Sequence, residues 1–317
     1  MMTLFIDCVY AQSTITNANK NEANTRSELR LEHSVAVVYP DIREPYLSVF
    51  KSIIKGISTE LDTKIKSKAI KSNDDIKTVS LWLEEQQASS VISLGSAGLK
   101  ISELLSEDYN NVVGAVLITN QQQKYIKNAI SMTPAPHKLF SKLKDLSPHV
   151  EKISVIYDSD TQGWLIEQAK LAAMEINIQL HAIEAKDTRS SALIYRELLS
   201  KQQSGVDALW LLQGDQALKE RSVLYMILKN AWDKNLIVFS SNPSHVTKGV
   251  LFSLYPDNEK LGKSLAKAAV ESANDNAIGI RALEDLLTAV NVRTAEHLGL
   301  NISRSERREF DMVFPIR

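Results

Sequence analysis

The spacings that mark common catalytic sites are missing from this sequence of 317 residues. A nucleophile elbow needs Gly-x-Ser-x-Gly, whereas in Leu94-Gly-Ser-Ala-Gly98 a glycine directly precedes the serine. Gly262-Lys-Ser264 ends like a phosphate-binding loop, but Asp257 stands where that motif has its first glycine. The dinucleotide motif Gly-x-Gly-x-x-Gly does not occur. The sequence therefore contains no motif for nucleophilic catalysis or nucleotide binding.

The sequence also gives little evidence for a metal site or for acid–base catalysis. The six histidines show no metal-ligand spacing, either among themselves or with the single cysteine, Cys8. An enzyme, such as a two-lobed hydrolase or transferase, would need an acid–base pair, and Asp158 and Asp215 could form one only by facing each other across a cleft. We therefore expect no enzymatic activity, no metal and no cofactor. The histidines, expected at the surface or in packing positions, are His33, His137, His149, His181, His245 and His297.

Short β-branched strands alternate with amphipathic helices, and the pattern occurs twice. A strand over 35–39 ends in Pro40-Asp41, and a strand over 153–157 ends in Asp158. An amphipathic helix follows each of them. Such alternation predicts a parallel sheet, and two copies predict an α/β protein with two doubly wound lobes. The helices are expected at 46–61, 74–87, 164–176 and 191–202, and the further strands at 65–70, 90–95, 112–119, 178–183, 206–214 and 236–240.

Ligands of doubly wound sheets bind beyond the carboxyl ends of the strands, so the residues there are the binding candidates. Ser96 and Ala97 open a predicted helix whose N-terminus and free hydroxyl suit an anion, although Ser96 could instead cap that helix. Arg43 could bind a carboxylate or be a solvated charge. Asp41 could contact ligand or cap the helix that follows. The other candidates are Tyr39, Thr119, Asp158, Trp164, Asp215, Ser241 and Tyr255.

Aromatic and acidic candidates have different uses. Tyr39, Trp164 and Tyr255 could form apolar walls around a ligand. Asp158 and Asp215 could meet an ammonium group, and turn chemistry explains an aspartate at either place equally well. By strand alternation, Trp210 is expected in the core of the second lobe.

The composition indicates an ordinary globular protein and argues against nucleic-acid binding and membrane insertion. Hydrophobic residues make up 44% and charged residues 24% of the chain, as in ordinary globular proteins, and the length suits two lobes. A net charge of -1 provides no basic field for nucleic acid. No run of 18 apolar residues occurs, so we expect no membrane insertion. Residues 1–11 are predicted to be a signal-peptide remnant and 12–33 a disordered lead-in, which places the protein in the periplasm.

The C-terminal third shows a family resemblance. Ile237-Val-Phe-Ser-Ser-Asn-Pro243 precedes Gly249-Val-Leu-Phe-Ser-Leu-Tyr-Pro-Asp257, and Leu286-Leu-Thr-Ala-Val-Asn-Val-Arg-Thr-Ala295 precedes Leu298-Gly-Leu300. This order resembles the substrate-binding proteins of an ABC-transporter family whose best-known members bind aromatic amino acids. The resemblance extends over about residues 34–315. It implies a type I periplasmic-binding-protein fold with three crossings between lobes, and a loop at Ser96 that helps to hold the ligand's carboxylate.

The resemblance also implies lobe limits and partners. We expect lobe 1 over 34–132 and 243–282, and lobe 2 over 133–242 and 283–317, with 249–255 returning to the sheet of lobe 1. The protein would capture an amino acid or small carboxylate by hinge closure and present this small-molecule ligand to an ABC permease. The alternative is a ligand-binding sensor that acts with a membrane signalling partner. A sugar-type repressor would need a helix-turn-helix, and the residues before Val35 lack helical periodicity.

Overall fold

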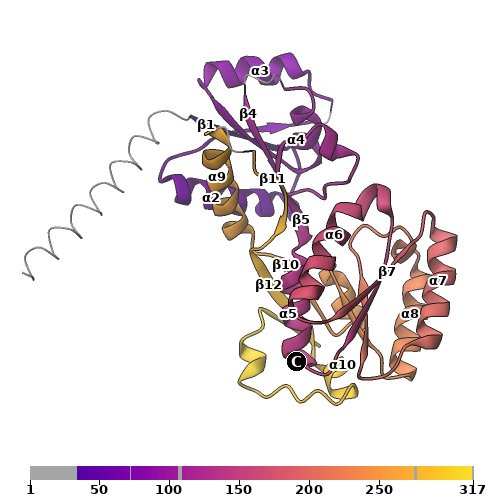
Figure 1. The fold of residues 1–317 in the computed structure, drawn as a ribbon. Helices are drawn as coiled ribbons and strands as arrows, with labels where there is room; N and C mark the ends of the chain where they lie inside the picture. Colours follow the sequence, from indigo (N-terminus) through magenta and orange to yellow (C-terminus); the bar gives the residue numbers. More distant parts are fainter. Residues whose placement is uncertain (1–33, 72, 106–108, 275–276, 316–317) are drawn as a thin grey trace, which may run out of the picture.

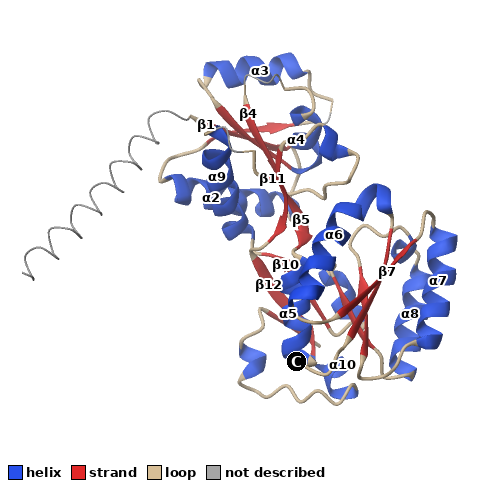
Figure 2. Ribbon diagram, viewed as in Figure 1, coloured by secondary structure: helices blue, strands red, loops and turns tan. Residues whose placement is uncertain are grey.

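The structure, a computed structural model, describes residues 34–315 apart from 72, 106–108 and 275–276 (Figure 1). The predicted signal-peptide remnant (1–11) and lead-in (12–33) lie outside these residues. Two lobes lie one above the other, and each consists of a sheet with helices packed against both faces (Figure 2). This is the predicted α/β arrangement of two doubly wound lobes.

Among the described residues, the sheet of lobe 1 has six strands, in the order β11-β5-β4-β3-β1-β2, and all neighbours are parallel. Helices α2 and α9 pack against one face of this sheet, and α3 and α4 against the other. The elements are β1 (Val35–Pro40), α2 (Tyr46–Leu61), β2 (Lys66–Ile70), α3 (Ile76–Glu85), β3 (Ser90–Leu94), α4 (Gly95–Ser102), β4 (Asn110–Gly114), η1 (Gln122–Lys124), β5 (Asn128–Pro134), α9 (Asn258–Ala273) and β11 (Gly279–Leu283).

The sheet of lobe 2 has seven strands among the described residues, in the order β13-β12-β10-β9-β8-β6-β7, with β12 antiparallel to β10 and the other pairs parallel. Helices α5, α6 and α10 pack on one face, and α7 and α8 on the other. The elements are α5 (Pro136–Leu146), β6 (Lys152–Tyr157), α6 (Ser159–Glu175), β7 (Gln179–Glu184), α7 (Thr188–Lys201), β8 (Asp207–Leu211), η2 (Ala217–Lys219), α8 (Arg221–Asp233), β9 (Ile237–Ser240), η3 (Pro243–Lys248), β10 (Phe252–Pro256), β12 (Leu286–Asn291), α10 (Val292–His297), η4 (Glu306–Arg308) and β13 (Met312–Phe314).

Within the described part of the chain, the backbone passes between the lobes three times. β5 of lobe 1 leads into α5 of lobe 2, β10 of lobe 2 leads into α9 of lobe 1, and β11 of lobe 1 leads into β12 of lobe 2 (Figure 1). β5 is parallel to β4 and β10 is parallel to β9, and each leaves its own sheet from its carboxyl end. The carboxyl ends of the parallel strands of both sheets therefore point toward the boundary between the lobes.

The second crossing lies later in the chain than the sequence predicts. The prediction that 249–255 joins the sheet of lobe 1 is wrong, because β10 pairs with β9 and β12 in lobe 2, and 243–256 thus accompany lobe 2. Helix η3 turns the chain back beside β9, where Phe252 stacks on Phe239 with ring centroids 5.3 Å apart. The sequence of an apolar strand after a turn is compatible with either sheet. Which sheet the strand joins is therefore determined by tertiary contacts.

Side chains at the ends of β10 and β12 cap the helices that follow these strands. The Asp257 carboxylate, just after β10, accepts a hydrogen bond from the Lys260 N–H at 3.1 Å and caps α9. The Asn291 side chain, at the end of β12, accepts one from the Thr294 N–H at 3.0 Å and caps α10. Each crossing strand thus passes into its helix with the first orphan donors satisfied.

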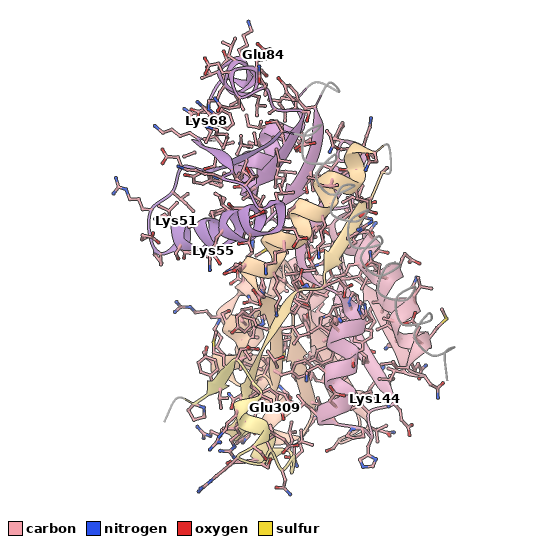
Figure 3. All side chains as sticks on the ribbon, turned by 90° about the vertical axis from the view of Figure 1, so that its left-hand side faces the viewer. Lys51, Lys55, Lys68, Glu84, Lys144 and Glu309 are labelled. Carbon is pink, nitrogen blue, oxygen red and sulfur yellow. The ribbon has the colours of Figure 1, made fainter. Side chains whose placement is uncertain are left out.

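Helices α2 and α9 touch backbone to backbone at two glycines. A Cβ at Gly262 would lie 2.0 Å from the Ile53 carbonyl oxygen, and one at Gly56 would lie 2.0 Å from the Glu259 carbonyl oxygen. An ion pair between Lys55 and Glu259, at 2.7 Å, joins the same helices at the surface. Figure 3 shows Lys55 on α2. Glycine costs helix stability, so its use at both positions reflects the close approach.

Candidate ligand-binding site

The end of β1 brings three of the predicted residues to the boundary between the lobes. Tyr39 is half-buried and stacks on Phe50, with ring centroids 6.4 Å apart. Asp41 and Arg43 follow the strand and are exposed to solvent. Asp41 does not cap α2, which begins after Pro45 without a side-chain cap. Both charged side chains therefore remain accessible beside the strand ends of lobe 1.

Helix α4 begins directly at the end of β3 and contains Ser96 and Ala97. Its N-cap is Leu94, which forms no side-chain hydrogen bond, so Ser96 does not cap its own helix. Ser96 is exposed, and its hydroxyl makes no hydrogen bond within the described residues. The side chain of Ala97 is buried, which leaves only its backbone N–H for a ligand. The free hydroxyl stands at the positive end of the helix dipole, where an anion is stabilised.

The strand ends of lobe 2 use their acidic groups locally. Asp158 caps α6 by accepting a hydrogen bond from the Asp160 N–H at 3.0 Å. The carboxylate of Asp215 accepts one from the Tyr195 hydroxyl at 2.8 Å and one from the Ala217 N–H at 2.8 Å. Burial raises the pKa of Asp215, and these two hydrogen bonds partly oppose that rise.

Asp158 and Asp215 do not form the acid–base pair that an enzyme would need. They follow β6 and β8, which are neighbours in the sheet of lobe 2, so neither faces the other from the opposite lobe. The condition set for enzymatic chemistry is therefore not met.

Three further candidate residues are buried or hydrogen-bonded within the protein to different degrees. Ser241 is buried, and its hydroxyl accepts a hydrogen bond from the Trp210 indole N–H at 2.8 Å, in the core where Trp210 was predicted. The N–H and hydroxyl of Thr119 both donate to Gln122 Oε1, at 2.9 and 3.1 Å. Tyr255 is half-buried within β10, at the second crossing, and burial raises the pKa of its phenol.

The predicted Trp164 joins the two lobes. Its backbone N–H donates to Asn120 Oδ1 at 2.9 Å, and its indole N–H donates to the Ile118 carbonyl at 3.0 Å. Asn120 in turn donates to the Ser159 carbonyl at 2.8 Å. The loop after β4 in lobe 1 thus rests on the first turns of α6 in lobe 2. The indole N–H is thus already used within the protein.

Asn120 and Gln162 belong to the site region but were not predicted from the sequence. Gln162 is buried; its Oε1 accepts the Asp158 N–H at 3.0 Å, and its Nε2 donates to the Gln213 carbonyl at 3.2 Å. This side chain bridges the ends of β6 and β8. The available signals were the position of Asn120 beside a predicted strand end and that of Gln162 in the first helical turn.

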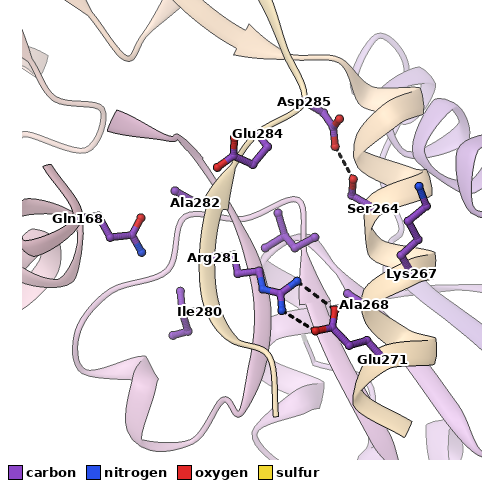
Figure 4. Close-up of a pocket in the computed structure, with 11 residues that line it drawn as sticks. Gln168, Ser264, Lys267, Ala268, Glu271, Ile280, Arg281, Ala282, Glu284 and Asp285 are labelled. Carbon is purple, nitrogen blue, oxygen red and sulfur yellow. Dashed lines mark hydrogen bonds and ion pairs between the residues drawn. The ribbon is translucent and has the colours of Figure 1, made fainter. Parts of the chain in front are cut away.

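A groove of about 400 Å³ lies beside the third crossing, away from these strand ends (Figure 4). Its walls come from α9 and β11 of lobe 1 and from Gln168 on α6 of lobe 2. The Arg281 guanidinium donates to both Glu271 carboxylate oxygens, at 2.8 and 3.1 Å, and the Ser264 hydroxyl donates to Asp285 at 2.5 Å. These pairs satisfy much of the charge in the groove.

His245 is buried below the end of β9. Its Nδ1 lies 2.9 Å from the Ser240 hydroxyl. Burial, with Lys248 nearby, lowers the pKa of His245 to about 4, so the ring is neutral near pH 7. Among the residues that the structure describes, no group of three His, Cys, Asp or Glu side chains could hold a metal ion.

Comparison with known proteins decides the family. The sequence pattern of ABC transporter substrate binding proteins matches residues 106–306, which is more than half of the chain. The chain belongs to this family. Its members bind substrate without catalysis, so this substrate-binding protein is a solute-binding component of an ABC transporter, and the family is typically extracytoplasmic. None of the described helices combines the length and apolar character needed to cross a membrane.

Solved structures show the same fold. An ABC domain in complex with L-Trp from Streptococcus pneumonia is 19% identical, with a TM-score of 0.53 over 89% of this chain and 100% of that one. A ligand-free, open substrate binding protein with adhesive properties from Clostridium difficile is 14% identical, with a TM-score of 0.59 over 89% and 99%. A periplasmic ribose ABC transporter protein from Conexibacter woesei is 11% identical, with a TM-score of 0.50 over 87% and 97%. No curated protein sequence matches the chain.

Proposed function

We propose that this substrate-binding protein captures an amino acid or another small carboxylate between its lobes and presents it to an ABC permease in the periplasm. The observation that carries the proposal is the opposition of two sets of strand ends across three crossings. A ligand that contacts both sets gains its full contacts only when the lobes approach. Binding therefore shifts the population toward the closed arrangement.

The carboxylate end of the ligand is assigned to lobe 1. The Ser96 hydroxyl is exposed and is not used as a helix cap, and the N-terminus of α4 favours an anion. The backbone N–H of Ala97 would add a second donor. Arg43, exposed after β1, supplies a permanent positive charge on the same lobe.

The rest of the ligand is assigned to aromatic and polar groups on both lobes. Tyr39, Trp164 and Tyr255 would form its apolar walls, with Asp41 and Thr119 as polar contacts from lobe 1. Asp158 would meet an ammonium group from lobe 2. Asp215 and Ser241 hold their strand ends through Tyr195 and Trp210, so their side chains would act on the ligand indirectly.

Thermal unfolding with a ligand panel tests the proposal. The panel contains amino acids and small carboxylates, with sugars as the competing class, because relatives of the same fold were solved with L-Trp and described as a ribose transporter. A ligand at a hundredfold excess over its Kd stabilises by about 2.7 kcal/mol, a shift of several degrees. Shifts with sugars alone, or with no compound, would contradict the proposed substrate class.

A pair of variants in α4 tests the carboxylate contact. Ser96→Ala removes the exposed hydroxyl, and we expect the Kd of the stabilising ligand to rise at least about tenfold, because a hydrogen bond to a charged group contributes about 1.5–3 kcal/mol. Ser102→Ala is the matched control, since within the described part of the chain its hydroxyl bonds only to the Leu99 carbonyl of the same helix. Equal affinities of the two variants, measured by calorimetry, would remove Ser96 from the site.

A further inference from the structure

Apart from the covalent crossings, three hydrogen bonds join the loop after β4 to the start of α6. The amide of Asn120 makes two of them, accepting from the Trp164 N–H at 2.9 Å and donating to the Ser159 carbonyl at 2.8 Å. The Trp164 indole makes the third, to the Ile118 carbonyl at 3.0 Å. The Asn120 amide therefore forms hydrogen bonds with both a backbone donor and a backbone acceptor of the opposite lobe.

Gly163 allows this contact. A Cβ at this position would lie 2.6 Å from Nδ2 of Asn120, closer than side-chain atoms approach one another. Gly163 lies inside the 17-residue helix α6, where glycine lowers stability relative to alanine. The close approach of the amide gives a reason for the glycine.

Both sides of the contact are firmly held by their own lobes. Ile118 is buried in a core cluster of lobe 1. On the other side, Leu165 and Ile166 follow Trp164 directly and are buried in the core of lobe 2. Gln162 also fastens the start of α6 to the ends of β6 and β8. A change at this contact should therefore move the two lobes relative to each other as rigid units.

We propose that Asn120, Gly163 and Trp164 form an interlobe latch that restricts the lobe orientations and thereby tunes ligand affinity. The latch draws the strand ends of the two lobes together, which is the direction of ligand-driven closure. Loosening it leaves a ligand with more orientations to restrict, so the affinity falls. Asn120 acts as a positioning residue through lobe geometry, whereas Trp164 would also contact the ligand directly. The existence of the latch is independent of the proposed function, whereas its effect on affinity rests on it.

Distances between spin labels on the two lobes test the latch directly. The full chain carries Cys8→Ser and labelled cysteines at the exposed positions Lys100 on α4 and Arg196 on α7. Asn120→Ala and Trp164→Phe should each broaden the distance distribution. Asn230→Ala is the matched control, because among the residues that the structure describes its side chain bonds only to the Met226 carbonyl within α8. It should leave the distribution unchanged. Distributions of equal width in all four proteins would overturn the proposal.

Gly163→Ala gives a test in which the expected effect on the label distances depends on whether Asn120 is present. In the otherwise unaltered chain, the added methyl should displace the Asn120 amide and broaden the distances as Asn120→Ala does. In the Asn120→Ala background, the same change should leave the distances unaltered and raise Tm, because only the gain in helix propensity remains. A raised Tm with narrow distances in both backgrounds would show that the amide does not rest on the helix.

The link to affinity is measured separately. For a ligand found in the panel, we expect Asn120→Ala to raise Kd about 3- to 10-fold and Asn230→Ala to leave it unchanged. Unaltered affinity together with broadened distances would overturn the tuning role. The distance measurements need no ligand, so an unresponsive panel would count against the proposed function and not against the latch.

Discussion

Replacing Gly262 with alanine tests whether the contact between α2 and α9 holds lobe 1 together. The new Cβ would lie 2.0 Å from the Ile53 carbonyl oxygen and 3.0 Å from Cα of Gly56, and both are backbone atoms. An ordinary contact needs at least about 3.4 Å, so the Cβ and the Ile53 oxygen must separate by roughly 1.4 Å along a line that the close-packed core resists. Overpacking of this kind costs about 1–3 kcal/mol, and more when backbone must move.

The opposing effect is smaller. Alanine in a helix interior is favoured over glycine by about 1 kcal/mol, so the expected net loss is about 2 kcal/mol. For lobes and chains of this size, that loss lowers Tm by roughly 4–8 °C. Thermal and urea unfolding measure it, with Lys263→Ala on the same helix as a control that changes propensity only slightly. An unchanged or raised Tm for Gly262→Ala would refute the reasoning, because the methyl would then fit without separating the helices.

Two further predictions concern buried polar groups of lobe 2. The pKa of His245 is lowered to about 4, below the unfolded value of 6.5, so the unfolded chain binds the extra proton first. Stability should therefore fall as pH decreases from about 6.5 to 4, by at most about 3.4 kcal/mol. Urea midpoints across this range should lose that slope in His245→Gln, and a slope unaltered by the substitution would contradict the assignment. Tyr195→Phe should destabilise the protein by about 1–3 kcal/mol, because the partly buried Asp215 carboxylate loses a hydrogen-bond donor. The same loss should raise the pKa of Asp215 further, which NMR titration of its carboxyl carbon measures. A lowered pKa would show that the Tyr195 hydroxyl does not stabilise the carboxylate.

Much of the fold is predictable from the sequence because its signals are local. Alternation along β8 placed Trp210 in the core, and it lies there, edge to face with Phe140 at 5.3 Å. Asp257 and Asn291 cap the helices that directly follow them, and such a cap depends only on a few neighbouring residues. The sheet that receives β10 was mispredicted because β-pairing is non-local, and the sequence of an apolar strand is compatible with either sheet.

The candidate site is predictable in location and less so in chemistry. Strand ends with polar residues are visible in the sequence, but the partner of each side chain is not. Asp41 precedes the first residue of α2 by too many positions for a cap, whereas the Glu44 carboxylate reaches the Ser48 N–H at 3.0 Å. The hydrogen bond from Tyr195 to Asp215 spans two elements, and that between Asn120 and Trp164 spans two lobes. Such pairs depend on tertiary structure that periodicity does not encode.

The contacts beside the crossings suit a hinge. Glu284, in the third crossing, pairs with His137 at 3.0 Å and with Lys138 at 3.8 Å, next to the first crossing. All three side chains are about half exposed, and such pairs contribute little to stability. The lobes on either side are held by buried cores and, in lobe 1, by the close contact of α2 with α9. Bending at the crossings therefore breaks ion pairs that contribute little, whereas the latch at Asn120 and Trp164 restrains through hydrogen bonds how the lobes turn.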